Sequence, residues 1–386
     1  MNWLSKFVQL IGIEKGLIFV TAGNTIASLV GAIFWLFIAS LLLVEDYGRL
    51  NYHLSLASLL SVLSLLGLNT TVTTFLAKGN ESLKYQANLL VLISNCFVIL
   101  SLLIFIKEIP TVFLTIGISF YTMSWAEILG RKDYKKYSFV LILQRSLQIC
   151  LSLLLYFIIG LDGLIIGYAL SVLLLSYNFF KSFKAFRLTI GELRQKSSFI
   201  IHSYSQAIAN TLTWYMDKLL VAPLFGFGVL GLYQISFQFL LFLAIIPLSL
   251  FQFLLPRDAS QITGKKYIII GLIVAGISST SFFIAIPTMI KTFFPHFIQS
   301  IQASQIMIFS VIPMTANSIL ISKSFGREKS KPVLIAAIIY IFILLFLMVA
   351  LGSILGLIGL AVSVLISSTA QFLALFFMSK WLFLTR

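Results

Sequence analysis

Runs of apolar residues long enough to cross a lipid bilayer follow one another along almost the whole chain. A membrane-spanning helix needs about 20 mainly apolar residues. Only 10% of the 386 residues are charged, whereas a typical soluble domain carries about 25%. This pattern excludes a soluble protein and predicts an all-α integral membrane protein with twelve transmembrane helices. The predicted spans are residues 17–43, 52–76, 85–106, 110–129, 138–159, 162–180, 199–225, 229–255, 267–290, 303–323, 332–351 and 355–379.

Positive charge separates the two sides that these spans define. Of the 27 Lys and Arg residues, only Arg49, Lys107 and Lys291 lie in loops on one side, and only Arg145 and Lys218 lie inside predicted spans. All the others lie on the opposite side. Because cytoplasmic loops are enriched in Lys and Arg, we expect both termini in the cytoplasm. The net charge of +15 is then explained by membrane topology, and no nucleic acid is expected as a partner.

The two halves of the chain carry a weak internal repeat. Asn24 precedes Tyr47 by 23 residues, and Asn210 precedes Tyr233 by the same 23 residues. Each Asn lies in the first predicted span of its half, and each Tyr opens the second. Six helices per copy would give both copies the same orientation, so their pseudo-twofold axis would run along the membrane normal. We expect two six-helix bundles with a cargo site near the membrane midplane between them.

The predicted division of the chain follows from this repeat and from the longest cytoplasmic connection. The first residues lack a cleavage site of small residues and place Trp3, Phe7 and Leu10 on one helical face, so they predict a retained segment on the membrane surface. The predicted parts are an interfacial segment at 1–16, a six-helix bundle at 17–180, a cytoplasmic linker at 181–198 and a second six-helix bundle at 199–386.

Motifs for catalysis are missing from the sequence. His53, His202 and His296 are not spaced with a second metal ligand or a carboxylate, and no GxxxxGK phosphate loop is present. The outer loops are short turns that could not build a solvent-facing active site. We therefore predict no enzyme activity, no catalytic residue, no metal site and no cofactor.

Polar residues inside the predicted spans are the strongest indication of function, because ionisable groups at membrane depth usually face a cavity. Asp217 and Lys218 lie deep in the seventh span. Adjacent residues of a helix point about 100° apart, so we expect these two charges to serve different neighbours. The stripe that ends in Asp217 predicts a water-filled cavity, whereas interhelical hydrogen bonding is the favoured interpretation for Asn24, Asn210 and Asn317 taken singly. The stripe consists of Ser203, Gln206, Asn210, Thr213 and Asp217.

Arg145 is the other cation inside a predicted span, in the stretch LQRSLQ. Of its two glutamine neighbours, only Gln148 shares its helical face. The planar guanidinium can bind phosphate oxygens in pairs, and the alternative is an arginine that extends to the inner interface. Glu127 and Arg131 are four residues apart and predict an ordinary ion pair on a helix.

Four stretches resemble a known family in their order and spacing. They are DYGRLNYHLSLASLLSVLSLLGL, LQRSLQICLSLLLYFIIGLDGLIIGYALS, WYMDKLLVAPLFGFGVLGLYQIS and FFPHFIQSIQASQIMIFSVIPMTANSIL. Together they resemble the polysaccharide, O-antigen and teichoic-acid flippases of the multidrug/oligosaccharidyl-lipid/polysaccharide exporter superfamily. One departure is that many members of the family have two further C-terminal helices, which puts lipid-tail binding in doubt.

The resemblance implies a multi-pass plasma-membrane flippase that moves a polyprenyl-diphosphate-linked oligosaccharide by alternating access, for surface polysaccharide synthesis. The implied partners are this anionic glycan lipid, H⁺ or Na⁺ as a coupling ion, membrane lipids and polysaccharide assembly proteins. Arg145 and Lys218 match basic positions of the family's cationic cavity, and Asp217 matches its acidic position. The expected cavity residues are Arg145, Lys218, Asp217, Asn210, Gln206, Asn24, Gln148, Arg49 and Asn317.

A cation-coupled multidrug antiporter of the same fold is the alternative. Such a protein should carry an acidic site in its N-terminal half, and the first span here has no carboxylate between Glu14 and Glu45. A major-facilitator transporter is less well matched, because the loop LAKGNESLKYQ lacks the expected Gly- and Arg-rich pattern.

Overall fold

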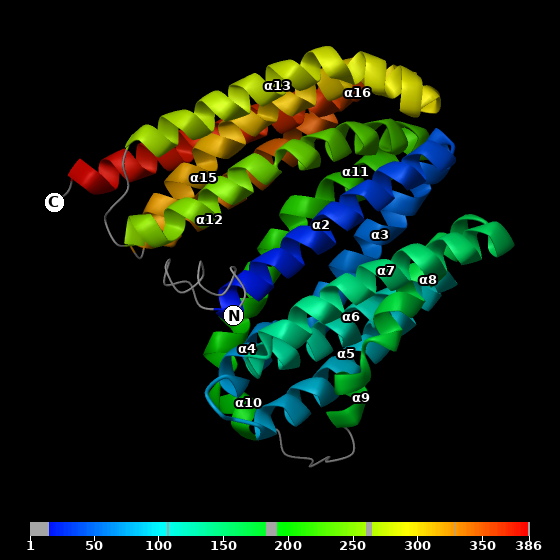
Figure 1. The fold of residues 1–386 in the computed structure, drawn as a ribbon, viewed down its shortest axis with the longest axis vertical. Coiled ribbons are helices and arrows are strands. Elements are labelled where there is room, and N and C mark those ends of the chain that lie inside the picture. The colour runs from blue at the N-terminus through cyan, green and yellow to red at the C-terminus, as the bar shows by residue number, and fades with distance from the viewer. Residues whose placement is uncertain (1–14, 106–107, 183–190, 260–264, 328, 385–386) are drawn as a thin grey trace, which may run out of the picture. The chain divides into compact units, whose positions relative to one another are not determined.

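Every regular element in the described part of the chain is a helix. The structure is a computed structural model, and it describes residues 15–105, 108–182, 191–259, 265–327 and 329–384. The predicted interfacial segment therefore lies almost entirely outside the described residues, as does much of the predicted linker. Figure 1 shows the elements, which are α2 (Lys15–Leu41), α3 (Val44–Leu65), α4 (Leu68–Leu76), α5 (Ser82–Phe105), α6 (Ile109–Gly130), α7 (Tyr134–Ile159), α8 (Leu161–Leu174), α9 (Tyr177–Ser182), α10 (Gly191–Gln195), α11 (Ser197–Leu243), α12 (Ile245–Ala259), α13 (Lys265–Phe293), η2 (Pro295–Ser300), α14 (Ile301–Met307), η3 (Ile308–Ser310), α15 (Val311–Gly326) and α16 (Lys331–Leu384).

Eight helical stretches in the described residues are long and apolar enough to cross a membrane, or nine if the bent pair α3 and α4 is one span. The protein is thus a multi-pass membrane protein. Two of the helices, α11 and α16, each join two helical segments across a glycine with a positive φ, at Gly226 and Gly356. Because a chain can reverse at such a glycine, the predicted count of twelve spans remains a prediction.

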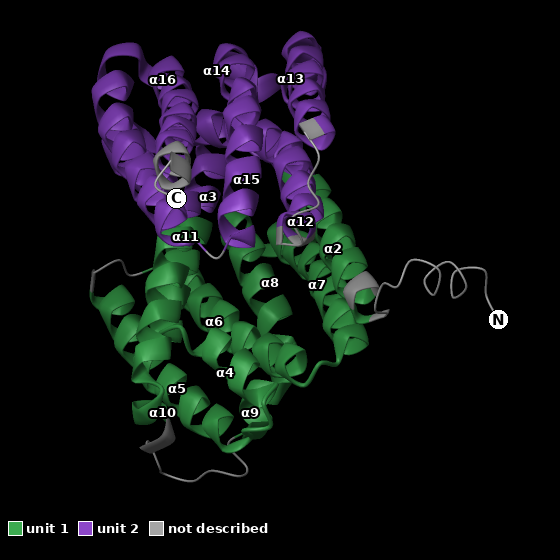
Figure 2. Cartoon of the chain, turned by 90° about the vertical axis from the view of Figure 1, so that its left-hand side faces the viewer, with its two compact units in different colours: residues 1–35, 53–211 green, residues 36–52, 212–386 purple. Residues whose placement is uncertain are grey.

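The chain divides into two compact units, which Figure 2 shows in green and purple. Unit 1 comprises residues 1–35 and 53–211, and unit 2 comprises residues 36–52 and 212–386. The predicted bundles differ from these units in two places, because residues 36–52 group with unit 2 and residues 199–211 group with unit 1. Helices α2, α3 and α11 are therefore each divided between the units, and the predicted bundle boundaries remain a prediction.

Unit 1 is built around α6, which packs against α4 and α8, while α7 packs along α8. Its core contains mainly aliphatic side chains together with two aromatic ones, and the ring of Phe120 is stacked on that of Phe179 at 4.2 Å. Close packing of α7 and α8 requires a glycine at position 167, where a Cβ atom would overlap the backbone of Ser152. Small residues at such crossings are typical of membrane helices.

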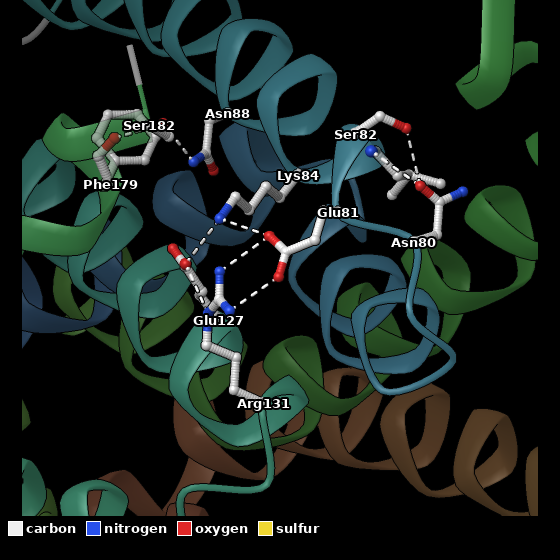
Figure 3. Close-up of polar contacts among 10 residues, drawn as sticks. Asn80, Glu81, Ser82, Lys84, Asn88, Glu127, Arg131, Phe179 and Ser182 are labelled. Atoms are coloured by element: carbon white, nitrogen blue, oxygen red, sulfur yellow. Dashed lines mark hydrogen bonds and ion pairs between the residues drawn. The ribbon is translucent and has the colours of Figure 1, made fainter. Parts of the chain in front are cut away.

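A network of four charged side chains ties α5 to α6 in unit 1 (Figure 3). The Lys84 ammonium, which is buried, lies 3.0 Å from Glu127 and 2.9 Å from Glu81. Arg131 contacts the same two carboxylates, at 3.0 Å and 2.8 Å respectively. The predicted pair of Glu127 and Arg131 is confirmed, but it is part of a larger network that the spacing along one helix could not indicate.

Unit 2 packs α12 against α15, and α15 and α14 against α16. Within this unit, the start of α3 crosses the second half of α11 in a reciprocal way. A Cβ atom on Gly48 would overlap the carbonyl oxygen of Phe227, and one on Gly231 would overlap the carbonyl oxygen of Val44. Segments 44–48 and 227–231 therefore contact each other as two copies related by a twofold axis would. The two glycines are 183 residues apart, whereas the predicted repeat relates residues 186 apart, so the repeat remains a prediction.

Candidate functional site

Helix α11 folds back on itself and so brings distant residues of its own sequence together. The chain turns at Gly226, whose φ of 87° and ψ of 164° are not helical. Nothing within 4 Å would contact a Cβ atom there, so the glycine is required for its backbone conformation rather than for space. The turn places Tyr233 on the second arm beside Asp217 on the first.

Asp217 and Lys218 form a buried ion pair with each other. The Lys218 ammonium donates to both Asp217 carboxylate oxygens at 3.0 Å and to the Trp214 carbonyl oxygen at 2.8 Å. The Tyr233 hydroxyl donates to Asp217 Oδ2 at 2.7 Å. The side chains of Asp217 and Lys218 are only 2% and 5% exposed. We call Asp217, Lys218 and Tyr233 the aspartate–lysine site.

This geometry corrects one prediction from the sequence. The expectation that Asp217 and Lys218 serve different neighbours is wrong. The angle between adjacent Cβ positions is as expected for a helix, but the four methylene groups of lysine are long enough to fold back. The ammonium of Lys218 reaches a carbonyl one turn earlier and the neighbouring carboxylate at the same time.

The polar stripe of α11 is divided in its environment. Gln206 and Asn210 are exposed and lie in unit 1, whereas Asp217 is buried in unit 2. Exposed amide groups on a membrane-spanning helix need water or a polar ligand around them. The two ends of the stripe therefore have different surroundings, and the predicted water-filled cavity remains a prediction.

Arg145 is the centre of a second polar cluster, in unit 1. Its Nη1 donates to Gln148 Oε1 at 2.7 Å, as the predicted shared face requires. Gln144 donates to the same oxygen at 3.3 Å and to the Ser171 hydroxyl of α8 at 3.2 Å. Helix α2 lies beside the guanidinium, since a Cβ atom on Gly31 would lie 3.4 Å from Arg145 Nε, which is an ordinary contact distance.

Two donors in this cluster have no acceptor within the described part of the chain. They are the buried Tyr121 hydroxyl and the buried Gln148 Nε2. Tyr121 lies within electrostatic reach of Arg145 and Tyr168, and Trp35 packs edge-on against Tyr168 at 6.4 Å. Among the described residues, Arg145 has no ion-pair partner. We call Arg145, Gln148 and Tyr121 the arginine site.

Three further predicted residues contact residues that do not belong to either site. Asn24 accepts a hydrogen bond from the Tyr137 hydroxyl of α7 at 3.2 Å. Asn317 donates to Gln371 Oε1 at 3.0 Å and to the Ser368 carbonyl. Both therefore make the interhelical hydrogen bonds that were the favoured interpretation for single asparagines. Arg49 is half exposed, lies 3.9 Å from Glu45 and stacks over the Phe227 ring at 5.5 Å.

Two site residues were not predicted from the sequence. Tyr233 was recognised only as a marker of the repeat, although it lies seven residues after the Gly226 turn and Asp217 lies nine residues before it. Tyr121 gave no signal, because one tyrosine among 14 in apolar spans is ordinary. No group of three or more His, Cys, Asp or Glu side chains lies together in the described ranges.

Comparison with solved structures places the fold. A structure of the lipid II flippase MurJ in an inward closed conformation aligns with a TM-score of 0.78 and 13% identity, covering 94% of this chain and 87% of that one. An inward-facing multidrug resistance MATE family transporter of the MOP superfamily aligns with a TM-score of 0.69 and 13% identity, covering 95% and 98%. A MATE protein in complex with MaL6 aligns with a TM-score of 0.60.

At the sequence level, no protein-family model and no curated protein matches the chain. The structural alignments extend over nearly the whole chain, and the aligned proteins are flippases and transporters rather than enzymes. The chain therefore has the fold of MurJ and of MATE transporters. The TM-scores show the shared fold. An identity of 13% does not show the cargo, which must be argued from the sites.

Proposed function

We propose that this protein is a plasma-membrane flippase that moves a polyprenyl-diphosphate-linked oligosaccharide by alternating access, for surface polysaccharide synthesis. The observation that carries the proposal is the arginine site. Arg145 is a half-buried cation that has no carboxylate partner among the described residues. An unpaired charge at membrane depth is energetically costly, and such a charge therefore usually marks a functional site.

The chemistry of the site fits a diphosphate. A guanidinium binds phosphate oxygens through paired, charge-assisted hydrogen bonds. Gln148 uses its carbonyl oxygen to hold Arg145 and leaves its NH₂ group without an acceptor. The Tyr121 hydroxyl is a second free donor. A ligand that supplies several acceptor oxygens and a negative charge would satisfy all three groups.

Lys218 takes a different role in this proposal from the one that the family resemblance implies. Its ammonium is already shared between Asp217 and the Trp214 carbonyl and is 5% exposed. We therefore assign the cargo's diphosphate to Arg145 rather than to Lys218. Polysaccharide assembly proteins and lipids of the membrane remain proposed partners.

A cation-coupled multidrug antiporter is the second candidate. The MATE alignments support it to the same degree as the MurJ alignment supports a flippase, and Asp217 is a buried carboxylate of the kind that could bind a cation. Arg145 disfavours it, because a cationic drug would be repelled by an unpaired guanidinium.

The test is flipping of a fluorescent polyprenyl-diphosphate glycan in proteoliposomes. We expect protein-dependent flipping that falls by about 10-fold or more in Arg145→Ala, since a hydrogen bond to a charged group contributes about 1.5–3 kcal/mol. Arg257→Ala is the matched control, because this arginine stacks on Phe253 and Tyr267 in unit 2. Export of a small organic cation with no glycan flipping would instead favour the antiporter.

A further inference from the structure

The buried carboxylate of Asp217 is surrounded in the way that a carboxylate that binds a metal cation usually is. The positive charge it contacts is the ammonium of the next residue, Lys218. Three oxygen atoms surround the Lys218 ammonium, namely both oxygens of Asp217 at 3.0 Å and the Trp214 carbonyl at 2.8 Å. The Phe237 ring closes the fourth side, with its centroid 4.0 Å from Nζ. The ammonium therefore has a complete shell of partners.

Carboxylate and backbone carbonyl oxygens are also the ligands that hard inorganic cations prefer. Tyr233 adds to this arrangement by fixing Asp217 Oδ2 with a hydrogen bond at 2.7 Å, as an outer-shell group orients a metal ligand. The oxygen ligands from Asp217 and Trp214 are thus positioned by α11 alone. The position between them is occupied by the ammonium of Lys218.

We propose that the Lys218 ammonium occupies the cation position of Asp217, so that the natural protein binds no Na⁺ there and loss of Lys218 opens a site for a small monovalent cation. The inference concerns ion binding and does not rest on the identity of the cargo. It implies that transport by the natural protein does not depend on Na⁺ binding at this carboxylate.

The physical reason is the cost of an unpaired charge. Removing one partner of a buried ion pair leaves the other uncompensated, which is strongly unfavourable. In Lys218→Met the apolar stem is kept and the positive charge is lost. The Asp217 carboxylate must then take up either a proton or a cation, and Na⁺ is an abundant hard cation that carboxylate and carbonyl oxygens can bind.

The experiment measures the melting temperature of the purified protein in detergent while NaCl replaces choline chloride at constant ionic strength. A ligand that binds only the folded state raises its stability with concentration. We expect no Na⁺-specific shift in the natural protein and a rise of a few degrees in Lys218→Met. Asp217→Asn/Lys218→Met should lose this rise, and Lys291→Met, which removes an exposed lysine of α13, should behave like the natural protein.

Two results would overturn the proposal. One is a Na⁺-specific stabilisation of the natural protein that Asp217→Asn abolishes, because the ion would then bind beside Lys218. The other is a folded Lys218→Met that responds to neither Na⁺, Li⁺ nor K⁺, because its carboxylate would have taken a proton instead. If Lys218→Met does not fold, Lys218→Gln replaces it and the natural protein alone still tests the first half. Failure of the glycan assay would leave all these outcomes unchanged.

Discussion

Arg145 in unit 1 and Lys218 in unit 2 are both cations on helices that can span the membrane, but their neighbours differ in kind. Lys218 is 5% exposed and shares its charge with the adjacent carboxylate of Asp217. Arg145 is half-buried and contacts an amide, Gln148, through one of its nitrogen atoms. The first cation is neutralised inside the protein, whereas the second has no negative partner among the residues that the structure describes.

In the proposed function, this difference separates a structural charge from one that binds the cargo. A neutralised pair contributes to the fold and has little left to offer a ligand, because its hydrogen-bonding groups are occupied. An unpaired guanidinium beside the free donors of Tyr121 and Gln148 is poorly satisfied until an anion arrives. Charge at membrane depth is therefore not by itself evidence of a cargo site, and its partners must be known.

The largest effect that the comparison predicts is on stability at the aspartate–lysine site. Asp217→Asn leaves the Lys218 ammonium buried without a carboxylate, which should lower the free energy of unfolding by about 3–5 kcal/mol. Thermal unfolding of the purified variant measures it. Asp217→Asn/Lys218→Met removes both charges and should recover most of the loss. A double variant no more stable than Asp217→Asn would show that the pair is not the stabilising element.

The second largest effect is expected where Gly231 of α11 packs against the start of α3. Gly231→Ala forces a methyl group into the carbonyl of Val44, and such overpacking costs about 1–3 kcal/mol or more. Gly228→Ala is the matched control three residues away, where nothing within 4 Å would contact the added atom. The yield of folded protein and its melting temperature compare the two. Equal behaviour would contradict the crossing and the position of Tyr233 that follows from it.

How far the sequence alone could predict this molecule depends on the range of each interaction. Apolar runs predict spans because one helix satisfies its own backbone in the membrane. The Arg145–Gln148 contact and the Glu127–Arg131 pair were predicted because both lie within one turn of helix. Two other contacts depend on how helices pack, which no spacing along the chain encodes. One joins Lys84 to Glu127, and the other places Tyr121 near Arg145. The prediction that Asp217 and Lys218 serve different neighbours was wrong, because it considered only the direction of each Cα–Cβ bond. The long lysine side chain can bend back to its neighbour.

The next effect in size is expected at the arginine site, where a substitution should reduce transport and leave stability unchanged. Gln148→Leu removes the acceptor that orients Arg145, and we expect flipping to fall by about 10-fold, which corresponds to 1.4 kcal/mol at 25 °C. Ser146→Ala on the same helix is the control, since that exposed hydroxyl bonds only within α7. A loss of melting temperature that accounts for the lost flipping would mean that Gln148 is structural.

The smallest predicted effect concerns Glu81, which lies outside the spans. Burial raises the pKa of its carboxyl, but hydrogen bonds and positive charge from Lys84 and Arg131 outweigh this and hold the pKa below its usual range. Such a group stabilises the fold above its unfolded pKa, and the contribution is lost as pH falls through its folded pKa. Glu81 is half exposed, so Glu81→Gln should cost about 0.2–1 kcal/mol at neutral pH.

A pH series of melting temperatures checks this prediction. The difference between the natural protein and Glu81→Gln should shrink as the pH is lowered through the carboxyl range towards about pH 3. Lys84 and Glu127 stay in place in both proteins, so the comparison isolates one carboxylate. A difference that is constant with pH would show that Glu81 acts through packing rather than through its charge.

The most direct test of the account is the affinity of the purified protein for a polyprenyl-diphosphate glycan, measured for Arg145→Met and for Asp217→Asn/Lys218→Met. Both changes remove a cation from a helix that can span the membrane, but the second also removes its carboxylate. We predict that Arg145→Met weakens binding by about 10-fold or more, while the double variant stays close to the natural protein. Undiminished binding by Arg145→Met together with a large loss in the double variant would contradict the assignment of the cargo to Arg145.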